Sequence, residues 1–448
     1  MSKLRLGVAR EIITPEVGGR LYGYAPDDRS ETVNDDLRAT AFYFSQGDVK
    51  ALMITADVCL IHDEIDLEIR NLIEEKFAVS KDACMLSATH THSGPCTSKN
   101  AGWGEIDREY CDKIFIPKIL SAVKNAIDNA REVTMAVGRG ECYAAVNRRS
   151  MMYDNHVGLG QNPWGVMDPK MTILAFNDSN GDSYANMIHY ACHETSAGRN
   201  PEITRDWSGY MTDRLEFVSK GMTAFFNGPE GDIGPRTSRG TTVGALNRVI
   251  ESDIPGAAVP VKTYNDVAEV GHVAACDAMK IYNSIFDFHD VNLKVSSKDI
   301  NIPLKKLIPL EEAEAIYEKF KDGTENTMGM FCNYAQNVIE AYKNGYKEKE
   351  HFTFRQTIIK IGNVVFASFP YEPFSEIGLR IAKEFKNAAV LSLSNTNGTH
   401  GYFLTQEATV RAGYERDVFR YQSTQSYADD SDWHILTQTV EHIKELNS

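Results

Sequence analysis

Two histidines in the segment Thr89-His90-Thr91-His92 are the first residues of the sequence whose types and spacing suit them to chemistry. Histidine is the commonest metal ligand in proteins and the usual general base near neutral pH. Side chains at positions i and i+2 share a face of an extended segment, and in a loop both rings can reach one site. A His-x-His pair also occurs in ordinary polar turns, so the pair by itself leaves a metal site and a structural turn as alternatives.

Three further segments carry candidate residues. His193 lacks the second histidine of a zincin helix, because Ala197 stands at that place. Glu230 and Asp232 lie in a glycine-rich loop that does not fit phosphate, since no Gly-Lys-Ser/Thr follows and two carboxylates would repel a phosphate group. Glu372 lies between an apolar strand and a helix, where a carboxylate serves either in a site or in stabilising the helix N-terminus.

Apolar runs separated by turn signals predict the elements that position these residues. The sequence predicts strands over 50–59, 83–88, 171–176, 183–190, 223–226, 352–361 and 364–369, and helices over 63–77, 266–285, 309–321 and 374–385. Most of the candidate residues follow a strand, where loops commonly carry function. The pattern predicts an α/β fold, a mixed β-sheet core flanked by helices, in one domain over residues 1–448.

Composition narrows the classes of partner and the cellular location. With 47 Lys and Arg against 62 Asp and Glu, the net charge is −15, which argues against nucleic acid and against stable association with an anionic membrane. The eight cysteines are scattered without a CxxC pair, which is typical of reduced thiols. The N-terminus has no apolar signal region, and no stretch of 18 apolar residues occurs. We therefore expect a cytoplasmic protein with a small-molecule substrate.

The order of these segments resembles that of the neutral/alkaline (non-lysosomal) ceramidase family, over nearly the whole sequence. The most specific segment is ATHTHSGP at 88–95. The others are VAREIITP at 8–15 with Tyr22 and Tyr24, VNRRS at 146–150, Asp168-Pro169, CHETS at 192–196, GDIGP at 231–235, PYEPF at 370–374, and Tyr402 and Tyr414, twelve residues apart.

The resemblance implies an α/β catalytic domain that holds one zinc ion and hydrolyses an N-acyl amide. The zinc ligands that it implies are His90, His193, Glu372 and Tyr402. The groups that it implies on the substrate side are His92, Arg148 and Tyr414. Two imidazoles, a carboxylate and a phenol form a donor set that suits Zn²⁺. Asp57, at a strand end, is a candidate acceptor for orienting an imidazole, with a polar strand terminus as the alternative.

The sequence departs from the family pattern at two places near these residues. Gly234 stands where the family has a serine, which puts a serine-assisted route in doubt, and Tyr371 stands where the family has glycine, which we expect to add bulk close to the metal. We also expect neither a secretion signal nor the C-terminal β-sandwich domain of the secreted ceramidases. A chain of this kind is poorly suited to extracting a two-tailed lipid from a bilayer, so we expect a smaller and more polar substrate.

The leading hypothesis is a zinc-dependent hydrolase in which metal-activated water attacks the amide bond of a small polar N-acyl substrate. In it His92 moves protons and Arg148 and Tyr414 stabilise the oxyanion, while Glu230 or Asp232 acts as a base or braces its loop. A second hypothesis keeps the metal and changes the substrate to a lactone, ester or sugar derivative, with hydrolysis, isomerisation or elimination as the reaction. A third is a metal-binding pseudoenzyme, which the retained Arg148, His92 and Tyr414 disfavour.

Overall fold

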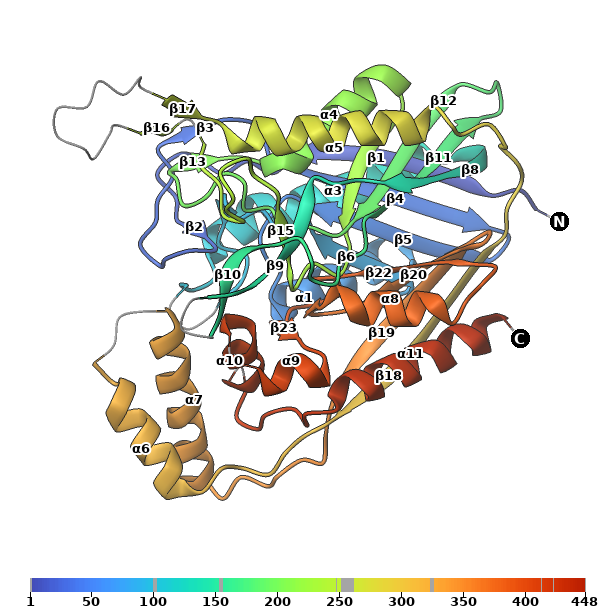
Figure 1. Ribbon diagram of the computed structural model, residues 1–448. Helices are drawn as coiled ribbons and strands as arrows, with labels where there is room; N and C mark the ends of the chain where they lie inside the picture. The colour runs from blue at the N-terminus through green and yellow to red at the C-terminus, as the bar shows by residue number, and fades with distance from the viewer. Residues whose placement is uncertain are drawn as a thin grey trace.

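A large β-sheet and a smaller one lie face to face, with helices on their outer sides (Figure 1). The computed structural model describes residues 2–99, 103–152, 156–246, 248–250, 262–322, 326–411, 413–421 and 423–447. The large sheet has the strand order β14-β12-β11-β8-β1-β4-β5-β6 and the smaller one β18-β19-β20-β22. The strands of the large sheet are β1 (Arg5–Ile12), β4 (Arg38–Gln46), β5 (Val49–Ala56), β6 (Cys84–Ala88), β8 (Arg131–Glu141), β11 (Lys170–Asp178), β12 (Ser183–Tyr190) and β14 (Met222–Asn227). Those of the smaller sheet are β18 (Leu293–Pro303), β19 (His351–Ile361), β20 (Val364–Ser368) and β22 (Ala389–Leu393).

Alternation of apolar side chains along the strands explains why the two sheets stack. In β4, Phe42 and Phe44 point toward the smaller sheet, whereas Ala41 and Tyr43 pack on the opposite side. In β20, Phe366 belongs to the core between the sheets, while Val365 and Ala367 face the other way. Side chains alternate between the two faces of a sheet with a period of two. Because the side chains on both faces are apolar here, both faces of each sheet must be covered.

Six helices cover the outer faces. The large sheet is covered by α1 (Asp63–Phe77), α3 (Ile116–Asp128), α4 (Asp206–Ser219) and α5 (Asp266–Tyr282), and the smaller one by α8 (Ser375–Lys383) and α11 (Ser431–Asn447). In α1, the isoleucines at 65, 69 and 73 form the buried stripe, with a spacing of four residues that suits a helix. The His62 ring accepts from the backbone N–H of Glu64, and acidic residues occupy the first turn, so its N-terminus is capped and its dipole is satisfied.

Shorter elements complete the chain around the ends of the strands. Small sheets are formed by β2 (Leu21–Tyr22) with β7 (Gly94–Pro95), β3 (Thr32–Val33) with β13 (Glu202–Ile203), β9 (Ala145–Met151) with β10 (Val157–Asn162) and β15 (Ile233–Pro235), β16 (Arg248–Ile250) with β17 (Lys262–Tyr264), and β21 (Glu372–Pro373) with β23 (Tyr402–Phe403). The remaining helices are α2 (Arg108–Tyr110), α6 (Leu310–Phe320), α7 (Asn326–Lys343), α9 (Gln406–Val410) and α10 (Tyr414–Tyr421), and a π-helical turn spans Cys111–Phe115. The α6–α7 pair lies beside α10, at the lower left of Figure 1.

The predicted fold class is confirmed, including the mixed sheet. The pairs β5–β6 and β12–β14 are parallel and the other neighbours in the large sheet are antiparallel. The predicted strand–helix–strand unit is β5–α1–β6, and the two predicted hairpins are β11–β12 and β19–β20. Among the described residues, no helix combines the length and apolar character needed to cross a bilayer.

Phe366 tests the core between the sheets. Its side chain is fully buried there, so the Phe366→Ala variant should lose about 3–5 kcal/mol of unfolding free energy through lost burial and the cavity left behind. Phe286 is 79% exposed, and Phe286→Ala should change the stability by less than about 0.5 kcal/mol. Denaturant unfolding of both variants is the measurement. Equal stability of the two variants would contradict the stacked-sheet core.

Candidate functional site

Segments that leave both sheets bring the implied ligands together. His90 follows β6 and His193 follows β12, both from the large sheet, whereas Glu372 follows β20 of the smaller sheet. Tyr402 pairs with Glu372 through the short parallel strands β21 and β23. All four side chains are buried, and the set is therefore assembled from parts of the chain that are distant in sequence.

One carboxylate oxygen is the point on which the site converges. Glu372 Oε2 lies 3.1 Å from His193 Nε2 and 3.5 Å from His90 Nε2. The Tyr402 hydroxyl lies 3.5 Å from His193 Nε2. Within the described part of the chain, Glu372 Oε2 is buried without a hydrogen-bond partner. A buried carboxylate oxygen in this position lacks the compensation that burial of charge requires.

Backbone carbonyls fix the orientation of the two imidazoles. His90 Nδ1 donates to the carbonyl oxygen of Cys59 at 2.8 Å, and His193 Nδ1 donates to the carbonyl oxygens of Glu230 and Ile233 at 2.8 and 3.0 Å. With Nδ1 as the donor, Nε2 of a neutral imidazole presents its lone pair. Both lone pairs then face the Glu372 oxygen, which is repulsive unless a positive charge lies among them. The residues present therefore fit a cation, and two nitrogens with two oxygens suit zinc.

The pKa shifts of these groups reflect burial and the charges of the neighbouring side chains. Burial, followed by the charge of Arg148, lowers the pKa of His193 to about 4, which favours its neutral form. Burial also acts to lower the pKa of His90, but Glu372 and Cys59 together outweigh it, and the pKa is raised well above its ordinary value. The pKa of Glu372 is held well below its usual range, because the two histidines outweigh the effect of its burial.

His90 itself adopts an unusual backbone conformation. Its φ is +80°, a left-handed value that costs a non-glycine residue about 1–3 kcal/mol. The amide of Asn395 lies near its ring, with Nδ2 3.3 Å from His90 Nδ1, and donates to Glu230 Oε1 at 2.8 Å. Asn395 was not predicted from the sequence, because a lone asparagine between a strand and a glycine-rich segment carries no distinctive signal.

His92 lies beside His90 and opposite two aromatic rings. Its Nε2 is 3.2 Å from His90 Nε2, and its Nδ1 donates to the carbonyl oxygen of Gly23 at 3.0 Å. The ring packs against Tyr24 and Trp103, at centroid distances of 5.1 and 5.9 Å. Gly23 has φ +131°, and a Cβ there would lie 2.6 Å from His92 Nδ1, so glycine is required for this approach. Burial and the neighbouring His90 and His193 keep the pKa of His92 well below its ordinary value.

Arg148 connects the candidate ligands to a carboxylate that sequence reasoning missed. Its Nη2 donates to the Tyr402 hydroxyl at 2.9 Å and its Nε donates to Glu415 Oε1 at 3.0 Å. Glu415 is buried and also accepts from Arg149 Nη1 at 2.5 Å. Tyr414 meets the ring of Tyr402 edge-on, with centroids 5.6 Å apart. The position of Glu415 directly after Tyr414 was the one available signal for its role.

The structure places the two carboxylates of the glycine-rich loop in different surroundings. Glu230 is buried against Asn395, and its pKa is raised by burial and by the nearby charge of Glu372. Asp232 accepts from the backbone N–H of Ser375 at 2.8 Å and from Asn147 Nδ2 at 3.0 Å, and burial raises its pKa to about 7. These contacts fasten the start of α8 to β9. They favour the bracing role for Asp232.

One sequence expectation needs correction, and one open alternative is decided. Tyr371 does not add bulk at the site, because its ring packs in the core beneath α8 and α11, and its hydroxyl lies 3.1 Å from that of Tyr427. For Asp57 the structure favours the polar strand terminus, since its Oδ2 accepts from the backbone N–H of Arg38. The orienting acceptors of all three histidines are backbone carbonyls.

The surroundings of Gly234 show what occupies the space where the family has a serine side chain. A Cβ at this position would lie 2.8 Å from Thr242 Cβ and 3.3 Å from the Thr242 carbonyl oxygen. That carbonyl accepts from Thr195 Oγ1 at 2.9 Å, which holds the segment in place. The space that a serine side chain would need is therefore filled by Thr242.

Comparison with known proteins identifies the family of this chain. Residues 4–254, more than half of the chain, match the family model "Neutral/alkaline non-lysosomal ceramidase, N-terminal". Neutral ceramidase A and neutral ceramidase B of Dictyostelium discoideum are 28% and 30% identical to this chain over 255 and 244 residues. Those alignments cover 52% and 50% of this chain but only 35% and 34% of the relatives' own length.

A solved structure extends the similarity to the rest of the chain. The crystal structure of neutral ceramidase from Pseudomonas aeruginosa superposes with a TM-score of 0.72 at 17% identity, over 99% of this chain and 74% of that one. The shared fold thus includes the smaller sheet, which lies beyond the family model. The chain belongs to the neutral/alkaline non-lysosomal ceramidase family.

Restoring the serine at position 234 should harm the protein. Gly234→Ser must displace Thr242, and overpacking of this kind costs about 1–3 kcal/mol. Thermal unfolding measures the loss, with Gly19→Ser as the control, because a Cβ at Gly19 meets its nearest atom at an ordinary 3.5 Å. A Gly234→Ser protein as stable as the control would show that the space beside Thr242 is open.

Proposed function

We propose that the chain is a zinc-dependent hydrolase that cleaves the amide bond of an N-acylated substrate. The single observation that carries the proposal is the convergence of His90 Nε2 and His193 Nε2 on the unpartnered oxygen of Glu372, in a buried site. Membership of the ceramidase family supports the amide as the bond cleaved, and the matched relatives carry the name neutral ceramidase. This favours the amide over the lactone, ester and sugar alternatives.

His90, His193, Glu372 and Tyr402 would hold the zinc ion. When bound in such a site, zinc supplies Lewis acidity, which polarises a carbonyl group and makes a water molecule acidic near neutral pH. Arg148 Nη2 donates to the Tyr402 hydroxyl. Burial raises the pKa of Tyr402 well above its ordinary value, and the positive charge of Arg148 opposes this shift. Burial of the four side chains excludes bulk water, so the electrostatic interactions among them are screened less than they would be in water.

His92 is the residue suited to moving the proton. Its Nδ1 is fixed on the carbonyl oxygen of Gly23, so Nε2 is the free nitrogen and points into the site toward His90. Because the pKa of His92 is held low, the ring is neutral and can accept a proton from the attacking water. The same nitrogen can then deliver that proton to the amine that leaves.

In this proposal Arg148 and Tyr414 stabilise the oxyanion that forms as the carbonyl is attacked. Arg148, from β9, and Tyr414, at the start of α10, both contact Tyr402, and both side chains can donate a hydrogen bond. Glu415 fixes the guanidinium of Arg148 at its Nε, which leaves Arg148 no freedom to turn away during the reaction. Preorganised donors of this kind act without reorganising in the transition state.

We further propose that the substrate is smaller and more polar than a two-tailed lipid, and that the enzyme acts in the cytoplasm. The net charge of −15 disfavours anionic membrane surfaces. Turnover of a short-chain fluorogenic N-acyl amide should exceed that of a long-chain ceramide presented in vesicles. Faster turnover of the ceramide would refute the small-substrate proposal and leave the amidase proposal intact.

Removal of one ligand should remove metal and activity together. Glu372→Gln keeps the volume of the side chain but loses the charge, and His193→Ala removes a nitrogen. Because even residues that only support a metal ligand contribute about 10–100-fold to metal affinity or activity, each variant should lose zinc and more than about 100-fold in kcat/KM. Elemental mass spectrometry and amide hydrolysis are the measurements, with the exposed Glu350→Gln as the control. Stoichiometric zinc in both variants would refute the ligand assignment.

Glu415→Gln tests the anchoring of Arg148. Loss of this buried charge should loosen the guanidinium and lower kcat about 10–100-fold, with a smaller change in KM, because the oxyanion rather than the bound substrate depends on it. Glu407→Gln is the matched control, since Glu407 pairs with Arg411 on the exposed surface. An unchanged kcat in Glu415→Gln would show that Arg148 holds its position without Glu415.

A further inference from the structure

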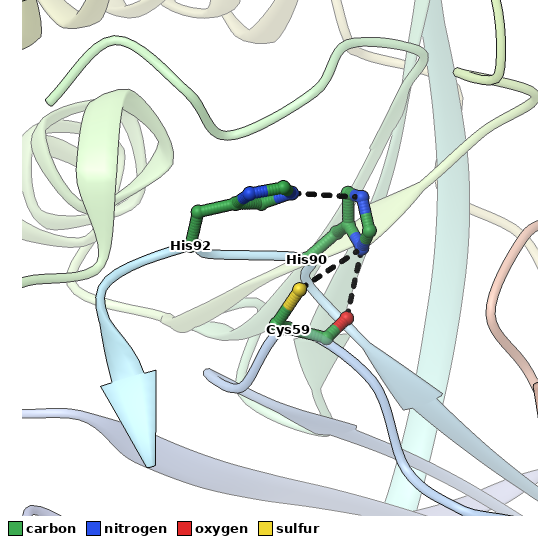
Figure 2. A group of neighbouring side chains, drawn as sticks. All are labelled: Cys59, His90 and His92. Atoms are coloured by element: carbon green, nitrogen blue, oxygen red, sulfur yellow. Dashed lines mark hydrogen bonds between the residues drawn. The ribbon is translucent and has the colours of Figure 1, made fainter. Parts of the chain in front are cut away.

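A cysteine lies directly against the ring of His90, on the side away from Glu372. Figure 2 shows the thiol of Cys59 beside His90 Nδ1, with His92 facing the other edge of the same ring. Cys59 Sγ is 3.8 Å from His90 Nδ1, and His92 Nε2 is 3.2 Å from His90 Nε2. Cys59 and His90 are fully buried, and His92 is 8% exposed.

These three side chains form a second group with the composition of a metal site. One ligand atom from each of Cys59, His90 and His92 lies within 4.8 Å of the other two. Bonds of about 2.3 Å to sulfur and 2.0–2.1 Å to nitrogen would place such atoms about 3.4–3.6 Å apart at tetrahedral angles, so the group contracts when it binds one ion. His92 Nε2 presents a lone pair to this group, because Nδ1 donates to Gly23. Two imidazoles and a thiol make a softer donor set than the group around Glu372.

We propose that Cys59, His90 and His92 form an alternative metal position that takes thiophilic ions, such as Cd²⁺ or Cu⁺, and that its occupation inhibits the enzyme. The inhibition, but not the binding, rests on the proposed function. His90 belongs to both groups, so an ion in the second group withdraws a ligand from the first. The same ion occupies His92, which then cannot accept a proton.

Binding has a defined proton balance. A bond forms between the ion and Cys59 Sγ, and the S–H bond breaks, with the proton released to the solvent. The metal–sulfur bond replaces the S–H bond, because the thiolate is the form of cysteine that ligates a metal. Ions that prefer nitrogen and oxygen gain little from the sulfur, which makes the second position selective for soft ions.

Cadmium titration of the full-length, metal-stripped protein tests the proposal without reference to catalysis. The thiolate-to-cadmium charge-transfer band in the ultraviolet reports a Cd–S bond directly. Cys276 is exposed and Cys332 is half-buried, so both are first changed to serine to remove adventitious thiols. We expect the band in this background and its loss in the added Cys59→Ser variant. A missing band in the background protein, or a band that persists in Cys59→Ser, would overturn the proposal.

Two further variants separate the second group from the first. Cys59→Ala repeats the test should the serine variant fail to fold, which circular dichroism reveals. Glu372→Gln belongs to the first group alone and should retain the band, whereas His92→Ala should weaken it. Loss of the band in Glu372→Gln would place the ion in the first group and overturn the assignment. In the background protein, which keeps Glu372, a cadmium band together with absent amidase activity after zinc loading would refute the proposed function alone.

Discussion

The structure depends on one electrostatic constraint, the burial of the Glu372 carboxylate opposite two imidazole nitrogens. Such an arrangement is stable only when a positive charge, from a metal ion or a proton, lies among these atoms. Several surrounding contacts hold these groups in position. The backbone carbonyls of Cys59 and Glu230 fix the rings, and Arg148 fixes the phenol. The left-handed backbone of His90 is part of the same constraint, since its strain is tolerated where the surroundings determine the conformation.

The stacking of two sheets explains how this constraint is met. His90 and His193 extend from the large sheet, and Glu372 and Tyr402 extend from segments that continue the smaller one. Direct contacts join the two sides close to the site, among them the hydrogen bond between the hydroxyls of Ser87 and Thr396 at 2.7 Å. The core between the sheets, rich in phenylalanine, therefore sets the ligand distances as well as the stability.

Local patterns in the sequence predicted the elements, and the resemblance to the ceramidase family implied the ligands, but neither predicted how the sheets are arranged. The isoleucines of α1 and the apolar run of β5 follow periods that are visible in the chain. The stacking of the second sheet on the first was not predicted, because it depends on contacts between residues that are distant in sequence. Glu415 and Asn395 were missed for the same reason, since their roles arise from partners that are 267 and 165 residues away. The groups that orient the histidines are backbone carbonyls. Every residue has one, so the residue types in a sequence do not reveal which carbonyl will act in this way.

The division of the ligand set between the two sheets has a consequence for biosynthesis. The first two ligands emerge from the ribosome within the first 193 residues, while the other two lie at 372 and 402. A nascent chain that has completed the large sheet holds only two of the four proposed zinc ligands. The proposed site can therefore form only after translation has passed residue 402 and the two sheets have come together.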